Sequence, residues 1–229
     1  WGNLKEFINP KPLQDLIDDL VNTPAGQDLI EDAKRAGIAI RFPDGTILGD
    51  PNGEVINVAY GDTGAGVLGY QSGQEIVIND DWLYRHSSSP EDLNAVIGHE
   101  IQHAIDMKEG FKDRTYYQGI EDCLDDPREL EEYLSRQTAD RVASETRAWE
   151  RGEAISEGRA FEDDGVTSGQ EARDILYQKG YVNNYLKELD NVPGLKDKYE
   201  VEYYVDQYNQ VRARVTPKPQ VADLGSSSW

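Results

Sequence analysis

Cysteine is nearly absent from this sequence: Cys123 is the one thiol in 229 residues. A single cysteine cannot form an internal disulfide, so no cysteine framework points to an oxidising compartment. Apolar runs long enough to span a membrane are also lacking, and no signal peptide is visible. Because Trp1 stands where an initiator Met is expected, we interpret the chain as a fragment or a processed product.

Basic residues are scarce relative to acids. The chain has 23 Lys and Arg against 44 Asp and Glu, which gives a formal net charge of −21. Such an excess of negative charge argues against binding to nucleic-acid phosphates and to anionic membrane surfaces. We therefore expect neither nucleic acid nor a membrane as partner. The hydrophobic content of 38% is that of an ordinary soluble domain with one sizeable core.

Histidine is the third scarce residue type, with three in the chain, and two of them are four positions apart. His99, Glu100 and His103 form the string HExxH. Residues four apart on a helix point the same way, so the two imidazoles can converge on one zinc ion. The glutamate between them then lies beside the metal and can take a proton from the water that the metal activates. The motif predicts Zn²⁺ bound by His99 and His103, with Glu100 as the general base.

The sequence around the motif predicts one well-defined helix. Ser89 to Asp92 supplies an N-cap, a proline at the first helical position and two acids in the first turn. Gly110 offers a C-terminal stop. Inward positions recur at steps of three and four residues: Leu93, Val96, Ile97, His99, His103 and Met107. Both histidines therefore lie on the face that we expect to be buried.

Residues close to the motif do not supply the third protein ligand that a catalytic zinc site takes. In the arrangement HExxHxxGxxH a glycine turns the chain back toward the metal, but here Asp106 holds that position and Glu109 holds the last one. Glu109 precedes any break in the helix and points away from the histidines. We interpret His86 as a loop or surface residue and Cys123 as a half-buried structural thiol.

A second helical pattern, from Pro127 to Gly152, carries a better candidate. Glu145 is the one acid on its apolar face, where a lone carboxylate is costly unless it is paired or bound to a metal. The residues of this face are Leu130, Leu134, Thr138, Val142, Glu145 and Trp149. We therefore expect Glu145 to be the third zinc ligand.

Other interpretations of this helix stay open. Asp140 and Glu150 are alternative third ligands if the helical phase slips by one residue. The alternative without a metal is an ion pair between Glu145 and an arginine of the same helix, Arg141 or Arg147.

His99, Glu100, His103 and Glu145 together resemble the zincin superfamily of zinc peptidases, in the gluzincin branch whose third ligand is a glutamate. The string from His99 to Ile105, followed by Glu109, Gly110 and Phe111, is also similar to metallopeptidase-like domains of bacterial polymorphic toxins and phage polyvalent proteins. The chain departs from the common gluzincin pattern at Trp149, where an Asp that orients a histidine usually stands.

The resemblance implies zinc-dependent hydrolysis of peptide bonds in a protein or peptide substrate, as a metalloendopeptidase. It also implies a secreted or delivered effector domain, with an inhibitor or immunity protein as a candidate partner. Tyr116, Tyr117, His86 and Arg141 are candidate donors to the developing oxyanion. The alternatives are a zinc-containing module that binds a partner without cleaving it, and a zinc hydrolase of a non-peptide amide or ester.

The expected fold class is α+β and zincin-like, with a mixed or antiparallel sheet before the HExxH helix, a helical second half and a C-terminal β-hairpin. Strands are predicted at 38–42, 46–48, 54–60 and 75–79, and the hairpin at 201–205 and 211–215. The resemblance implies that strand 75–79 borders the cleft with an exposed edge that receives an extended peptide. We expect a zincin-like core at 1–165, a helical and hairpin extension of the same domain at 166–215, and a flexible tail at 216–229.

Overall fold

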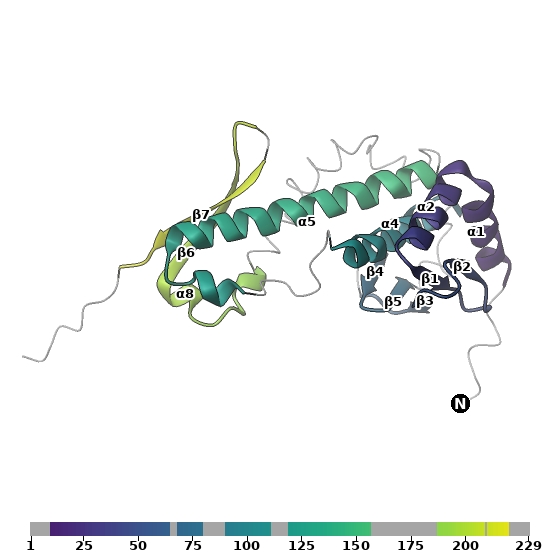
Figure 1. Ribbon diagram of the computed structural model, residues 1–229, viewed down its shortest axis with the longest axis horizontal. Coiled ribbons are helices and arrows are strands. Elements are labelled where there is room, and N and C mark those ends of the chain that lie inside the picture. Colours follow the sequence, from purple (N-terminus) through teal and green to yellow (C-terminus); the bar gives the residue numbers. More distant parts are fainter. Residues whose placement is uncertain are drawn as a thin grey trace, which may run out of the picture. The chain divides into compact units, whose positions relative to one another are not determined.

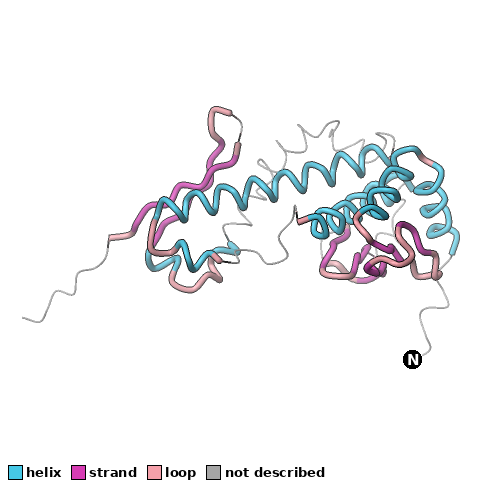
Figure 2. The backbone as a smooth tube through the Cα atoms, viewed as in Figure 1, coloured by secondary structure: helices cyan, strands magenta, loops and turns pink. Residues whose placement is uncertain are grey.

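The chain of the computed structural model divides into two compact units, each with its own hydrophobic core. The structure describes residues 10–64, 68–79, 90–110, 119–156, 187–208 and 210–219. Unit 1 comprises Trp1–Arg114 and Ser144–Arg173, and unit 2 comprises Thr115–Ala143 and Asp174–Trp229. Figures 1 and 2 show the helices and strands of both units. The domain boundaries expected at residues 165 and 215 stay a prediction.

Unit 1 begins with two helices, α1 (Pro10–Asn22) and α2 (Pro24–Arg35). Thr23 caps α2, because its hydroxyl accepts a hydrogen bond from the backbone N–H of Gly26 at 3.1 Å. Pro24 occupies the first helical position, where its missing N–H costs nothing. Beyond the end of α2, Gly37 takes a φ of 69°, a left-handed conformation that favours glycine. The sequence predicts a short helix over 13–21 and a second one that Thr23 and Pro24 begin and that ends near Gly37, and both are confirmed.

The helices are followed by a five-stranded sheet in the order β2-β1-β3-β5-β4. Three strands run parallel at its centre: β1 (Ile38–Arg41), β3 (Glu54–Gly61) and β5 (Glu75–Asn79). Two strands, β2 (Ile47–Gly49) and β4 (Gly69–Ser72), add antiparallel edges. The sheet is therefore mixed, and the combination of helices and a mixed sheet is compatible with the expected α+β class.

The expectation that strand 75–79 has an exposed edge is wrong. β5 lies between β3 and β4, so both of its backbone edges are paired. The missed strand β4 reads Gly-Tyr-Gln-Ser and lacks the run of β-branched residues that marks a strand in sequence. Gly73, at a φ of 57°, lies between β4 and β5 and returns the chain. The outer position on this side of the sheet thus belongs to β4.

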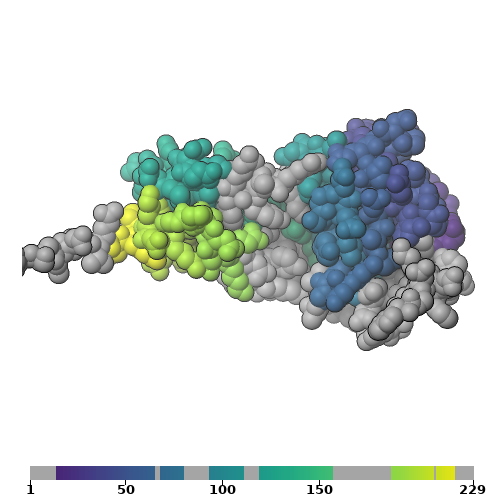
Figure 3. Space-filling view, turned by 90° about the horizontal axis from the view of Figure 1, so that it is seen from below, coloured from purple at the N-terminus to yellow at the C-terminus, as the bar shows by residue number. Residues whose placement is uncertain are grey.

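The core of unit 1 lies between one face of the sheet and the helices. Alternating residues of the three parallel strands point into it: Ile38, Ile40, Ile56, Val58, Ile76 and Ile78. They pack with apolar residues of α1, of α2 and of α4 (Pro90–Glu109), the last including Ile97, Ile101 and Ile105. Arg41 and Asn57 alternate with these core positions and are exposed. Figure 3 shows unit 1 from the side of its strands.

Helix α4 confirms the predicted helix over 90–109, and Gly110 follows it at a φ of 81°. The second long helix, α5, runs from Pro127 to Ile155. Asp126 caps it, since its Oδ1 accepts from the backbone N–H of Arg128 at 2.8 Å. The expectation that Gly152 ends this helix is wrong, because the helix continues to Ile155. No described helix has the length and apolarity required to cross a membrane.

Unit 2 contains η2 (Ile120–Cys123), the first part of α5, α8 (Leu195–Lys198) and the hairpin of β6 (Tyr199–Val205) and β7 (Val211–Pro217). The predicted hairpin is confirmed, with Val201 opposite Val215 and Val205 opposite Val211. Its residues pack on α5, where the Ser135 hydroxyl accepts from the backbone N–H of Ala213 at 2.9 Å. The sequence also predicts a loop over 162–169 and one or two helices over 170–189; the loop and all but the last three residues of these helices lie outside the described residues, as does the end of the tail from residue 220.

Candidate metal centre

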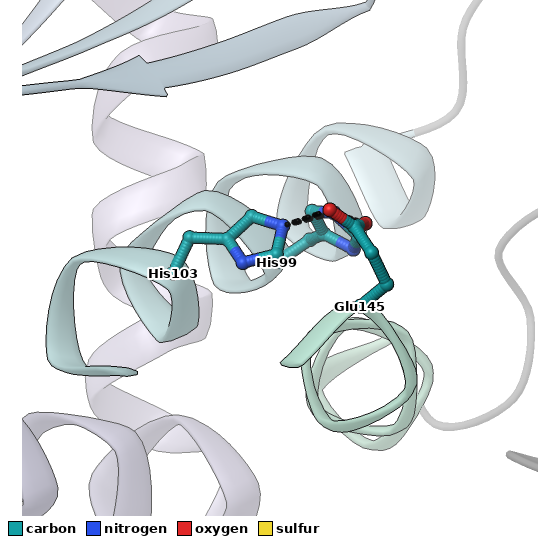
Figure 4. Close-up of side chains that lie close together, drawn as sticks. All are labelled: His99, His103 and Glu145. Atoms are coloured by element: carbon teal, nitrogen blue, oxygen red, sulfur yellow. Dashed lines mark hydrogen bonds and ion pairs between the residues drawn. The ribbon is translucent and has the colours of Figure 1, made fainter. Parts of the chain in front are cut away.

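Three side chains of unit 1 meet at one point (Figure 4): His99 and His103 from α4, and Glu145 from α5. The two Nε2 atoms lie 3.0 Å apart. Oε1 of Glu145 lies 3.3 Å from Nε2 of His103, and Oε2 lies 3.5 Å from Nε2 of His99. Each residue offers one ligand atom, and these atoms all lie within 4.8 Å of one another.

The residues present fit a zinc ion. Zinc–nitrogen bonds of about 2.0–2.1 Å at a tetrahedral ion place two ligand nitrogens roughly 3.3 Å apart. The observed separations of 3.0, 3.3 and 3.5 Å are close to this value, so the ligands need little rearrangement. Two imidazoles and one carboxylate also form the donor set of a catalytic zinc site, which leaves a fourth position open.

Burial and charge prepare the site for a cation. His103 is 3% exposed, and the side chains of His99 and Glu145 are 17% and 19% exposed. Burial by itself raises the pKa of Glu145, but hydrogen bonds from the protonated imidazoles of His103 and His99, together with their positive charge, outweigh it and hold this pKa well below its ordinary value. Glu145 therefore stays ionised as an acceptor, the state that a metal ligand needs.

Two glycines let α4 and α5 approach closely enough for this convergence. A Cβ on Gly152 would lie 2.5 Å from the carbonyl oxygen of Ala95, so only glycine fits against the α4 backbone there. A Cβ on Gly98 would overlap the side chain of Ile155. The packing of the two helices at these points places Glu145 opposite the histidines.

A second polar cluster lies behind His103. Its Nδ1 is 3.3 Å from the hydroxyl oxygen of Ser144, and that hydroxyl donates to Oδ2 of Asp106 at 2.7 Å. Asp106 is 1% exposed and also accepts from Arg147 and Gln102. Sequence reasoning missed this cluster, because it weighed Asp106 only as a departure from glycine. The available signal was an acid three residues after His103 on the inward face of the helix.

Glu100 lies on α4 between the two histidines and is 6% exposed. Trp149, which stands where the gluzincin pattern has an Asp, packs edge-on against the His99 ring with centroids 5.5 Å apart. Trp149 therefore contacts this histidine by aromatic packing.

The alternative residues lie apart from the ligand cluster or have other partners. Asp140, Glu150 and Glu109 are exposed. Arg141 pairs with Glu188 at 2.9 Å, and Arg147 pairs with Asp106 at 2.9 Å, whereas Glu145 faces the histidines.

The remaining candidates fall into two groups. Cys123 belongs to unit 2, where it is partly buried, and desolvation raises the pKa of its thiol. Its place in η2 fits the structural role expected for it. The candidate oxyanion donors His86, Tyr116 and Tyr117 lie outside the described residues.

Comparison with known proteins yields no match to a family model, to a curated protein or to a solved structure. What the protein does must therefore be inferred from the site itself.

Proposed function

We propose that this protein is a zinc-dependent hydrolase of peptide bonds, zincin-like and with a glutamate third ligand. The observation that carries the proposal is the convergence of His99, His103 and Glu145, with the buried Glu100 next to His99 in the sequence. A site that only stabilised the fold would usually have four protein ligands and no use for a base. Three ligands with an adjacent carboxylate favour catalysis over a partner-binding module.

When bound, a zinc ion would polarise the carbonyl group of a substrate and make a water molecule more acidic. Glu100 would accept a proton from the water that attacks the carbonyl carbon. The same carboxylic acid then delivers the proton to the leaving amine. General base and acid catalysis of this kind contributes roughly 10²–10⁴-fold to rate. Its near-complete burial keeps Glu100 away from bulk water during both steps.

A peptide substrate is supported by the position of β4. This strand is the outermost in the described sheet on its side and packs against α4, with a Cβ on Gly69 falling 3.0 Å from Cγ1 of Val96. Among the described residues no strand pairs with its outer edge, whose backbone N–H and C=O groups can pair with an extended peptide. We propose β4, in place of β5, as the strand that a substrate joins.

The effector role, delivery or secretion, and an inhibitor or immunity protein remain proposals that rest on the resemblance. The net charge of −21 supports the expectation that nucleic acid and anionic membranes are not partners. It would favour a basic protein partner or substrate.

The direct test is cleavage of a proteome-derived peptide mixture by the full chain, with zinc and with a chelator. Sequencing of the new N-termini separates peptidase activity from other activities, and amide and ester probes are assayed in parallel. The proposal expects peptide cleavage that zinc restores after chelation. Cleavage confined to non-peptide probes would support the alternative hydrolase, and no hydrolysis by the zinc-loaded protein would leave the partner-binding module.

A further inference from the structure

We propose that Asp106 acts through Ser144 as a positioning residue that fixes the tautomer of His103. The inference rests on the proposed metal site and explains how this chain orients a ligand without the Asp that the gluzincin pattern places at 149. Its consequence is that Nε2 of His103 presents a lone pair toward Glu145 and His99, the direction from which a metal would bind.

The argument begins with the single proton of the Ser144 hydroxyl. That proton points to Oδ2 of Asp106, 2.7 Å away. The hydroxyl oxygen can then only accept a hydrogen bond from Nδ1 of His103, which lies 3.3 Å away. This hydrogen bond requires the ring hydrogen of the neutral imidazole on Nδ1. The second nitrogen, Nε2, is left unprotonated and able to bind a metal.

The direction of the Ser144 proton follows from the donors that surround Asp106. Oδ1 accepts from Nε2 of Gln102 at 2.9 Å and from Nε of Arg147 at 3.3 Å. Oδ2 accepts from Nη2 of Arg147 at 2.9 Å as well as from Ser144. The guanidinium of Arg147 thus contacts both oxygens of Asp106, the bidentate pairing of an arginine with a carboxylate, and the Ser144 hydroxyl meets an acceptor.

The orientation of the Gln102 amide is fixed in the same way. Its Oε1 accepts from Nε of Arg151 at 3.2 Å, which leaves its NH₂ group to donate to Asp106. Arg151 in turn pairs with Asp32 of α2. Hydrogen-bond donation therefore converges on Asp106, from Arg151 through Gln102, from His103 through Ser144, and directly from Arg147.

The hydrogen bonds of Asp106 and Ser144 form at the same contact between α4 and α5 as the proposed metal centre. Asp106 comes from α4, one turn after His103, and Ser144 immediately precedes Glu145 on α5. The packing that brings Glu145 to the histidines thus brings Ser144 to the back of His103. The same helix contact therefore both places Glu145 and orients His103.

A purely structural role for Asp106 would be an ion pair with Arg147 that joins the two helices. Such a pair would stabilise the fold but would not select a tautomer of His103. Ser144→Ala separates the two roles, because it removes only the hydroxyl and leaves the Asp106–Arg147 pair in place. Ser144→Thr is the matched variant, since it keeps the hydroxyl.

The experiment uses the metal-free full chain labelled with ¹⁵N-histidine, at a pH at which imidazole is neutral. Long-range ¹H–¹⁵N correlation spectra report the tautomer, and His103→Gln assigns the signal. We expect the Nδ1–H tautomer in the wild type and in Ser144→Thr, and its loss as the dominant form in Ser144→Ala. Zinc affinity should fall by about 10–100-fold in Ser144→Ala and recover in Ser144→Thr.

An Nε2–H tautomer in the wild type would overturn the proposal. So would a Ser144→Ala protein that keeps both the Nδ1–H tautomer and full zinc affinity. The tautomer is read without metal or substrate, so its result is independent of whether the protein cleaves peptides. A correct tautomer with no hydrolysis would refute the proposed function alone.

Discussion

Oε1 of Glu145 lies 3.3 Å from Nε2 of His103, and the two side chains come from different helices, α5 and α4. The contact joins a carboxylate held in its ionised form to an imidazole whose other nitrogen faces Ser144. Both side chains are therefore held in place in the metal-free protein, as the proposed metal site requires. Preorganisation of this kind reduces the free-energy cost of ordering the side chains when a metal binds.

Zinc should bind at about one ion per chain, and its removal should destabilise unit 1, because the ligands come from two helices. At a free zinc concentration of 100 times Kd, binding to the folded state alone contributes about 2.7 kcal/mol. Elemental analysis gives the stoichiometry, and thermal unfolding with and without a chelator gives the change in Tm. An absence of transition metal after reconstitution with zinc would contradict this prediction.

The third ligand can be identified by comparing acids on the same helix. Glu145→Ala should weaken zinc binding by orders of magnitude and abolish hydrolysis, because a ligand is lost from the cluster. The exposed Asp140 and Glu150 are matched controls, and their alanine variants should bind zinc as the wild type does. Competition titration with a zinc chelator measures all three, and loss confined to a control would move the site.

Glu100→Gln should retain zinc and the fold while losing hydrolysis by about 10²–10⁴-fold, because an amide keeps the shape but cannot accept the proton. Zinc content, Tm and kcat are measured on the same preparation. Wild-type turnover in this variant would exclude Glu100 as the base.

Gly152→Ala should lower both stability and zinc affinity. Alanine is favoured over glycine in a helix by about 1 kcal/mol, but the added Cβ would meet the carbonyl oxygen of Ala95 at 2.5 Å. Overpacking of this kind costs about 1–3 kcal/mol, and we expect it to outweigh the gain. Urea unfolding measures the effect, with Glu150→Ala as the control for an alanine on an exposed face of α5. An increase in stability would show that the helices can separate without loss.

The pH dependence of the metal-free protein should show the low pKa of Glu145. A carboxyl whose folded pKa lies below its unfolded value stabilises the fold above about pH 4.3 and loses this contribution as the pH falls toward the folded pKa. The difference in unfolding free energy between the wild type and Glu145→Gln should therefore shrink between pH 5 and pH 3. Urea unfolding at stepped pH measures it, and a constant difference would argue against the low pKa.

Local sequence determined the helix of the HExxH motif, the first two helices and the terminal hairpin. Pro90 and Gly110 mark the ends of α4, Thr23 caps α2, and Val201 to Val205 alternate as a strand does. These signals act within a few residues, so they are visible without a fold. The phase of α5 also follows from its periodicity, which is why Glu145 could be selected among its acids.

Tertiary structure decided what depends on distant segments. β4 carries little strand signal and forms because β5 offers a partner, which removes the edge expected for β5. Helix α5 continues through Gly152 because the absent side chain fits the backbone at Ala95, a benefit that outweighs the poor helix propensity of glycine. The link from His103 through Ser144 to Asp106 likewise exists only where α4 and α5 touch. Helix periodicity shows which face a residue occupies, but only the packing of one helix on another decides which side chains meet.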